Sequence, residues 1–319
     1  MPSCALSWNG NTALQLLMKA IYDVSAPAKL NLFLHITGRR SDGYHLLQSV
    51  FMLIDWCDRL HFELRADGQI SRTDLTAPLP PDDLTLRAAK ALRNATGCTD
   101  GAHISIEKSV PAEAGMGGGS SDAAATLLAL NRLWRLQVPL SKLLDIGLHL
   151  GADVPFFLQG RNAWVQGVGE QTTAIDVPPA QFLVAKPPAG LETARIFRSS
   201  QLKRDTKTAT LASFAENPFN FGVNDLQRVA QGLCPGVGVG LNWLESKGLK
   251  SRMTGSGSAV FAHLGARLGS NIDVGMDAGK GAHRGFETNR ELDGAPAGFV
   301  VRVCKNLQEH PLNGWAGAG

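Results

Sequence analysis

Apolar residues occupy every second position from Ala28 to Ile36, the spacing of a β-strand with one buried face. The intervening positions begin with Lys29 and Asn31, which we expect on the opposite, less buried face. Residues 55–59 read as a turn between two further strands. Strands are predicted by similar patterns at Leu46–Ile54, Leu60–Leu64, Ala102–Lys108 and Ala163–Val165.

Helical patterns follow in the first half of the chain. One helix is predicted at Asp83–Ala95, with Asp82 or Asp83 as its N-cap and Gly97 as its stop. Apolar residues nearly surround the helix expected at about Asp122–Trp134, so it should be buried. A shorter helix is predicted at Ser141–Leu150.

The chain is predicted to divide near Asp176–Gln181, where paired prolines favour an extended linker. We expect an N-terminal extension at residues 1–24, a first domain at 25–178 and a second at 179–319. A glycine-rich segment at 265–298 lacks a helical period, and residues 311–319 are expected to form a disordered tail. The second domain is predicted to contain strands at Phe182–Lys186, Ala259–Leu264 and Phe299–Cys304, and helices near Asn224–Gln231 and before Gly248.

Composition narrows the class of protein. Hydrophobic residues make up 44% and charged residues 18%, which is a globular balance. The formal net charge of +3 over 319 residues does not suggest a nucleic-acid partner. Neither a membrane span nor a leader peptide is evident, and the five cysteines show no zinc spacing, so we expect free thiols in a cytoplasmic protein. No metal ligand is assigned.

The stretch from Pro111 to Leu127, PAEAGMGGGSSDAAATL, places its glycines between a predicted strand and a predicted helix. Backbone N–H groups at the start of a helix bind anions, and glycines let a phosphate approach the main chain. A glycine run alone is more often a linker, but a linker seldom separates two packed elements. Neither the P-loop pattern nor the dinucleotide fingerprint is present, so this would be a phosphate loop of another kind.

Four motifs, one of them this loop, give the chain a resemblance to a known family. Residues 111–121 resemble the ATP-phosphate motif of the GHMP kinases, the superfamily of galactokinase and of homoserine, mevalonate and phosphomevalonate kinases. APAKLNL at 26–32 with RSDGYH at 40–45, LGADVPFF at 150–157 and MTGSGSA at 253–259 are similar to motifs of one branch. That branch phosphorylates a cytidine-diphosphate-linked methylerythritol on the non-mevalonate isoprenoid route. The motifs occur in the family's order along most of the chain.

The resemblance implies an α+β fold of two domains, the first similar to ribosomal S5 domain 2 and the second ferredoxin-like. It also implies that ATP, as its Mg²⁺ complex, phosphorylates the 2-hydroxyl of the acceptor in the cleft between them. The ATP site would consist of Pro111, Gly115, Met116, Gly117, Gly118, Gly119, Ser120, Ser121, Asp122, Gly255 and Gly257. We expect a monomer or weak homodimer.

Two residues would carry the chemistry. Without the resemblance, Asp153 reads as the N-cap of a following helix and Lys29 as a solvated lysine. By resemblance, Asp153 is the general base that takes the proton from the acceptor hydroxyl. Lys29 would keep that carboxylate ionised and stabilise charge on the phosphoryl group. Asn31 would help to position the acceptor.

The resemblance assigns other residues to the cytidine end. Tyr44 would stack on the base, His45 would bond its polar edge and Phe197 would cover its other face, with Val168 and Thr193 also lining the pocket. Alternatively, the first two pack within their own turn and Phe197 belongs to the core. The run at residues 202–205 reads as solvated charge. Other readings of the whole chain are a GHMP kinase for a smaller alcohol, such as homoserine or mevalonate, or an inactive nucleotide-binding relative.

Overall fold

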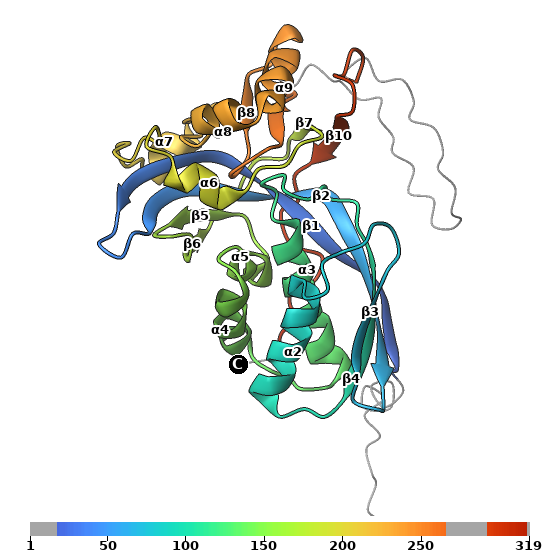
Figure 1. The fold of residues 1–319 in the computed structure, drawn as a ribbon. Coiled ribbons are helices and arrows are strands. Elements are labelled where there is room, and N and C mark those ends of the chain that lie inside the picture. The colour runs from blue at the N-terminus through green and yellow to red at the C-terminus, as the bar shows by residue number, and fades with distance from the viewer. Residues whose placement is uncertain (1–17, 266–291, 318–319) are drawn as a thin grey trace, which may run out of the picture.

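The structure of the chain is a computed structural model that describes residues 18–265 and 292–317. Two sheets and the helices packed on them make up the fold (Figure 1). The helices are α2 (Leu84–Thr96), α3 (Gly118–Leu133), α4 (Leu140–Leu150), α5 (Val154–Gln159), α6 (Thr193–Arg198), α7 (Leu211–Ala215), α8 (Gln227–Leu233) and α9 (Pro235–Ser246). The strands are β1 (Ala20–Arg39), β2 (His45–Arg65), β3 (Ile70–Asp74), β4 (Gly101–Glu107), β5 (Ala163–Gln166), β6 (Gln171–Ala174), β7 (Gln181–Lys186), β8 (Ser251–Met253), β9 (Val260–His263) and β10 (Val300–Lys305).

A long antiparallel hairpin, β1–β2, spans the molecule (Figure 1). The first sheet has the strand order β3-β4-β2-β5-β6, with β1 paired to β2, and α3 packs on both strands of the hairpin. The second sheet has the order β10-β7-β9-β8, and α9 covers it. In chain order its strands lie 4-1-3-2, the arrangement of a ferredoxin-like sheet. The predicted α+β class is confirmed.

Three expectations about the hairpin are wrong. β2 is one continuous strand, so the turn expected at residues 55–59 does not exist. Between Ala28 and Ile36, β1 is buried on both faces, since Lys29 and Phe33 are nearly as inaccessible as Leu30. β1 also begins at Ala20, and Val24 belongs to the core, so residues 20–24 are part of the first sheet. β2 continues through residues 57–59 because they pair with residues 25–27 of β1, a contact that no local pattern reveals.

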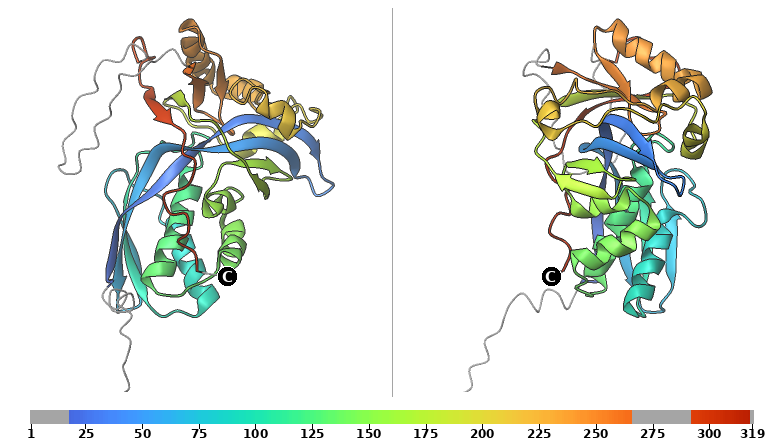
Figure 2. Two further views of the ribbon diagram at one scale, coloured as in Figure 1. Left: turned by 180° about the vertical axis from the view of Figure 1, so that it is seen from behind. Right: turned by 90° about the vertical axis from the view of Figure 1, so that its left-hand side faces the viewer.

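The carboxyl-terminal segment returns from the second sheet to the first (Figure 2). Asn306 bridges to Ile54, and Glu309 bridges to Arg161. Leu312 is buried in the core formed by α3, α4 and the first sheet. The disordered tail expected from residue 311 is therefore wrong for residues 311–317. The division of the chain into domains at residue 178 remains a prediction.

Local signals were sufficient for several elements. Asp83 caps α2 by accepting hydrogen bonds from the backbone N–H groups of Thr85 and Leu86, and Gly97 ends the helix in the left-handed conformation. β4 lies where alternation predicts it. Most of the glycine-rich segment expected at 265–298 falls outside the described residues.

Candidate active site

Two cavities of about 800 and 660 Å³ form one continuous cleft. Leu47, Val168 and Phe197 line both of them. The larger, which we call the phosphate cavity, is lined by β1, the glycine loop, the start of α5 and the turn at residues 255–257. The smaller, which we call the base pocket, lies between the tip of the β1–β2 hairpin and α6.

Lys29 and Asp153 meet in the phosphate cavity. Lys29 Nζ lies 3.7 Å from Asp153 Oδ2, and it donates to Asn31 Oδ1 at 2.5 Å and to the Gly115 carbonyl at 2.9 Å. Burial lowers the pKa of Lys29, while the nearby Asp153 carboxylate opposes that shift. The lysine is therefore a buried cation held by three oxygens, not the solvated residue of the alternative interpretation.

Asp153 stands at the N-cap position of α5 without acting as a cap. Its backbone is helical, and its side chain accepts no capping hydrogen bond. The side chain is 31% exposed, in contrast to 4% for Lys29. The carboxylate is therefore open to the cavity and available to a proton donor.

Asn31 is fixed from two directions. Its Nδ2 donates to Ser49 Oγ at 2.9 Å, and that hydroxyl donates to the Phe33 carbonyl at 2.5 Å. Its backbone N–H donates to Thr254 Oγ1 at 2.9 Å. These contacts leave Asn31 Oδ1 to accept from Lys29, so the amide orients the cation.

The glycine loop leads into α3 earlier than expected. Gly117 is the N-cap and the helix starts at Gly118, so Ser120, Ser121 and Asp122 are its third to fifth residues and do not cap it. The backbone N–H groups open to the cavity are those around Gly118–Ser120. Ser121 is fully buried and does not line the cavity, so its hydroxyl cannot contact a nucleotide there.

Gly115 and Gly255 are required by loop packing. Gly115 has φ +71°, and a Cβ there would lie 2.3 Å from the Thr254 carbonyl oxygen. Gly255 has φ +53°, and a Cβ there would lie 2.5 Å from the Gly115 carbonyl oxygen. The backbones of the two glycine motifs are thus in direct contact, and the turn at residues 255–257 packs against the side of the glycine loop.

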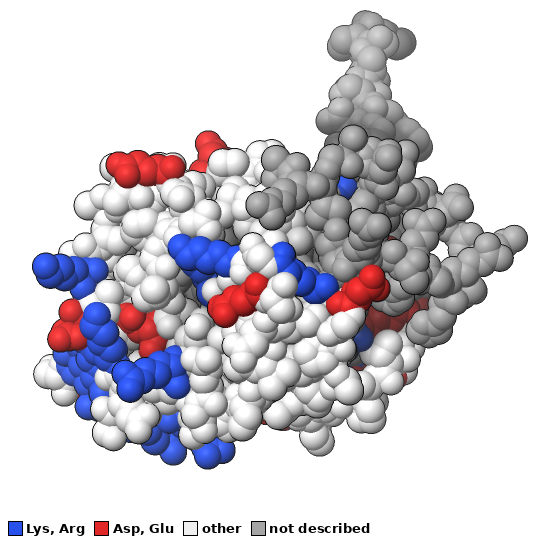
Figure 3. Space-filling model, turned by 90° about the horizontal axis from the view of Figure 1, so that it is seen from above, with Lys and Arg blue, Asp and Glu red and all other residues white. Residues whose placement is uncertain are grey.

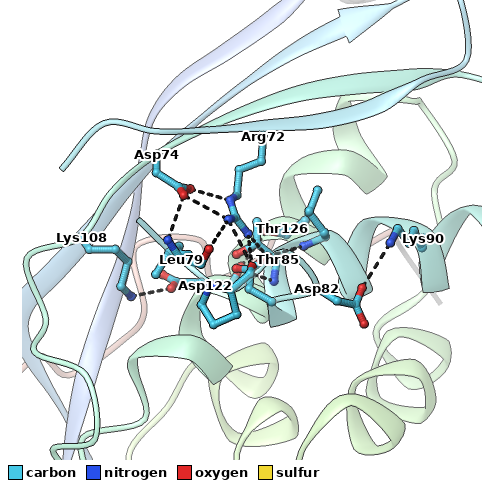
Figure 4. A network of polar contacts seen from close by, with 12 residues as sticks. Arg72, Asp74, Leu79, Asp82, Thr85, Lys90, Lys108, Asp122 and Thr126 are labelled. Carbon is cyan, nitrogen blue, oxygen red and sulfur yellow. Dashed lines mark hydrogen bonds and ion pairs between the residues drawn. The ribbon is translucent and has the colours of Figure 1, made fainter. Parts of the chain in front are cut away.

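A buried cluster of two carboxylates and one ammonium supports the start of α3. Lys108 Nζ contacts Asp58, and it also donates to Asp122 Oδ2 at 2.6 Å (Figure 4). Asp58 accepts from the backbone N–H groups of Ser109 and Val110 as well. Burial and the neighbouring Asp58 raise the pKa of Asp122 to about 8, although Lys108 opposes the shift. The cluster anchors the residues that lead from β4 into the glycine loop.

A second network holds the outer wall of the phosphate cavity (Figure 4). Arg72 donates to Asp74 at 2.5 Å and to the Leu79 carbonyl at 3.2 Å, and it also contacts Asp83. Asp74 in turn accepts from the backbone N–H of Leu79 at 2.9 Å. Leu79, Pro80 and Asp83 line the cavity, so this network fixes the wall that leads into α2.

Tyr44, His45 and Phe197 all line the base pocket, and their role in binding cytidine stays a prediction. The His45 and Phe197 rings have centroids 5.0 Å apart, whereas Tyr44 is 64% exposed. Val168 lines both cavities, and Thr193 lines the phosphate cavity, where its hydroxyl bonds Ser256 Oγ at 2.7 Å.

The pocket's charge is mainly positive. Arg39, Arg198 and Arg204 line it together with Asp42. Basic side chains gather on the side of the molecule where the tip of the β1–β2 hairpin lies in Figure 1 (Figure 3). This balance suits an anionic ligand.

Sequence reasoning missed Arg204, Lys108 and Asp58. Arg204 was read as part of a solvated charge run, yet its Nε donates to His45 Nε2 at 3.0 Å. Asp58 was placed in a turn that is absent. The contacts of each residue are separated by many positions in the sequence, and neither periodicity nor a motif reveals them. Glu113 lines the phosphate cavity, with its carboxylate beside Gly190 and near Lys186.

Comparison with known proteins gives the family. Residues 83–161 match the family model of the GHMP kinases N terminal domain. A curated 4-diphosphocytidyl-2-C-methyl-D-erythritol kinase from Albidiferax ferrireducens is 62% identical over 301 residues, covering 94% of this chain and 96% of the relative. One of the same name from Variovorax paradoxus is 59% identical over 314 residues, covering 94% and 100%. This chain belongs to the 4-diphosphocytidyl-2-C-methyl-D-erythritol kinase family.

Solved structures agree with that assignment. A crystal structure of 4-(cytidine 5'-diphospho)-2C-methyl-D-erythritol kinase matches with a TM-score of 0.67 at 35% identity, covering 75% of this chain and 88% of that one. A mevalonate kinase structure matches with a TM-score of 0.61 at 12% identity, covering 90% and 99%, which shows the shared fold alone. The resemblance inferred from the motifs is confirmed by these relatives. Kinases of this family use ATP.

Proposed function

We propose that this chain transfers the γ-phosphoryl group of ATP to the 2-hydroxyl of 4-diphosphocytidyl-2-C-methyl-D-erythritol. The observation that carries the proposal is the place of the Lys29–Asp153 pair. Lys29, Asp153 and the start of α3 line one cavity, and that cavity continues into the pocket of Tyr44, His45 and Phe197. An acceptor held by its base in the smaller cavity can present a hydroxyl in the larger one.

Asp153 accepts the proton of the attacking hydroxyl. Its carboxylate is accessible, and Lys29 provides a positive charge 3.7 Å away that favours the ionised form. As the hydroxyl oxygen attacks the γ-phosphorus, the bond to the bridging oxygen of ADP breaks and the proton passes to Asp153. A base of this kind contributes about 10²–10⁴-fold to the rate. Lys29 also stabilises the charge on the phosphoryl oxygens.

The start of α3 binds the ATP phosphates. Backbone N–H groups around Gly118–Ser120 face the phosphate cavity, and the helix dipole adds a favourable field. Pro111, Met116 and Asp122 also line this cavity. Gly115 packs closely against Gly255 and Gly257, and this packing holds the loop in one conformation for phosphate binding.

The oxygen donors here suit Mg²⁺. Ser120 and Asp153 both line the phosphate cavity, so it contains a hydroxyl and a carboxylate oxygen. Among the described residues no group of three or more His, Cys, Asp or Glu side chains could hold a metal. Mg²⁺ commonly binds one or two protein oxygens and takes its other ligands from phosphates and water. When bound, it would neutralise phosphate charge.

The acceptor is chosen in the base pocket. Tyr44 and Phe197 offer aromatic faces for a nucleobase, and His45 offers a polar edge. Homoserine and mevalonate carry no nucleobase that could contact these groups. A catalytically inactive relative would not require both Lys29 and Asp153.

An ADP-release assay with four acceptor conditions tests the proposal. The purified chain is given Mg·ATP with the cytidylated methylerythritol, with homoserine, with mevalonate or with no acceptor. We expect ADP release only with the first, together with a new phosphomonoester on its 2-hydroxyl by ³¹P NMR. Faster turnover of either small alcohol would reassign the substrate, and no turnover of any acceptor would indicate an inactive relative.

A further inference from the structure

Arg204 bridges the two walls of the base pocket. It follows α6, and its guanidinium reaches His45 at the start of β2. Its Nη1 donates to the Leu202 carbonyl at 3.0 Å. Its Nη2 donates to the Phe197 and Ser199 carbonyls at 3.2 and 2.8 Å. The side chain is thus anchored to the segment that carries Phe197, which fixes its remaining Nε–H toward His45.

This contact determines the proton position on His45. An arginine guanidinium has only donors and does not lose its proton in proteins. Nε2 of His45, which accepts from Arg204 Nε at 3.0 Å, must therefore carry a lone pair. The imidazole is then neutral, with its proton on Nδ1. The charges of Arg204 and Arg39, together with partial burial, lower the pKa of His45 and oppose a second proton.

The free edge of His45 is consequently a donor only. Nδ1 has no hydrogen-bond partner among residues 18–265 and 292–317, and the ring lines the base pocket. Cytosine presents acceptors at O2 and N3, whereas uracil carries a proton on N3. Both bases present an acceptor at O2, so the choice between them depends on an imidazole that faces N3. There a donor-only imidazole pairs with the lone pair of cytosine and opposes the N–H of uracil, because two donors cannot pair.

We propose that Arg204 is a positioning residue that holds His45 as the neutral, Nδ1-protonated tautomer, and that this tautomer selects a cytosine over a uracil base. The inference rests on the proposed function for its substrate, but it concerns the choice of base and not the transfer of phosphate. A role that is merely structural would weaken both bases equally.

The first test needs no substitution and no turnover. Nitrogen-15 NMR of histidine-labelled wild-type chain should show a protonated Nδ1 and an unprotonated Nε2 for His45. The His45→Gln variant assigns the resonances by their loss. A protonated Nε2 in the wild type would overturn the proposal.

The second test measures discrimination by binding. Calorimetry with CDP and with UDP, with the ATP site filled by a non-hydrolysable ATP analogue, gives the ratio of the two dissociation constants. Loss of one well-placed hydrogen bond in a partly buried site is worth about a tenfold change in affinity. In Arg204→Gln we expect the preference for CDP over UDP to fall about tenfold, and the NMR to show both tautomers.

Arg198→Gln is the matched control, because Arg198 lines the same pocket and makes no hydrogen bond to His45 in the described chain. It should weaken both ligands and leave their ratio unchanged. An unchanged ratio in Arg204→Gln, or equal binding of CDP and UDP by the wild type, would refute the proposal. The kinase function would be refuted separately, by absence of ADP release with the cytidylated acceptor.

Discussion

The two ends of the cleft are built differently. At the phosphate end, Lys29 is buried on β1 and held by Asn31, Gly115 and Asp153, and the loop beside it packs main chain on main chain. At the base end, Tyr44 is largely exposed and His45 is held from the side by Arg204. The phosphate end is built from contacts between β1, the glycine loop and residues 254–257, which follow β8. The base end consists of the tip of the β1–β2 hairpin and the short helix α6.

Under the proposed function, the phosphate end carries out the phosphoryl transfer and the base end selects the substrate. Rigid placement favours phosphoryl transfer, in which catalysis consists mostly of positioning and charge stabilisation. A pocket on peripheral elements can differ among relatives while the reaction remains the same.

The largest effect should come from the reacting carboxylate. Asp153→Asn removes the proton acceptor while leaving the cavity shape, so kcat should fall about 10²–10⁴-fold. ATP affinity, measured by calorimetry, should stay within a few fold. Asp82→Asn, which alters a carboxylate elsewhere in the same cavity, should keep normal turnover. Near-normal kcat in Asp153→Asn would remove the base from the mechanism.

The buried lysine should set the alkaline limit of activity. Burial lowers the pKa of Lys29 below its usual 10.5, so the protonated form is lost earlier as pH rises, and kcat should decline below pH 10.5. A kcat profile between pH 6 and 11 measures this limb. In Lys29→Arg the overall rate should be lower, and the decline of kcat at alkaline pH should be absent because arginine stays charged. A limb that persists unchanged in that variant would assign it to another group.

Loss of the stacking face should act on binding more than on turnover. Base–aromatic stacking contributes about 1–3 kcal/mol, so Tyr44→Ala should raise KM for the cytidylated acceptor roughly tenfold or more with a small change in kcat. Tyr22 is the chain's other tyrosine, is also exposed and lies outside both cavities. Tyr22→Ala should leave KM unaltered, and the same KM in both variants would exclude the stacking role.

The cluster of Asp58, Lys108 and Asp122 should affect the stability of the fold. Asp122 has a pKa raised to about 8 in the folded chain from 3.8, so the folded state binds the extra proton between these values. Its contribution to stability therefore decreases as pH rises from about 4 to 8. Relative to Asp122→Asn, the wild type should lose more than about 1 kcal/mol of unfolding free energy over that range. Urea unfolding at pH 5 and pH 8 measures this, and a pH-independent difference would contradict it.

Sequence reasoning reached what local pattern and motif encode. The cap at Asp83 and the stop at Gly97 depend on neighbouring residues, and the motifs pointed to Lys29 and Asp153. The continuity of β2 and the return of residues 306–317 to the first sheet depend on contacts distant in the sequence. The role of Arg204 could not be predicted for the same reason, because its contact with His45 joins residues far apart in the sequence.

The central claim of the proposed function is that the base pocket selects the acceptor for the reaction at the phosphate end. Its most direct test compares kcat/KM of the wild-type chain for 4-diphosphocytidyl-2-C-methyl-D-erythritol and for methylerythritol 4-phosphate, which keeps the acceptor alcohol but lacks the cytidine. We predict at least a 10²-fold preference for the cytidylated compound, because only it can occupy the base pocket. Equal values of kcat/KM for the two acceptors would contradict the account.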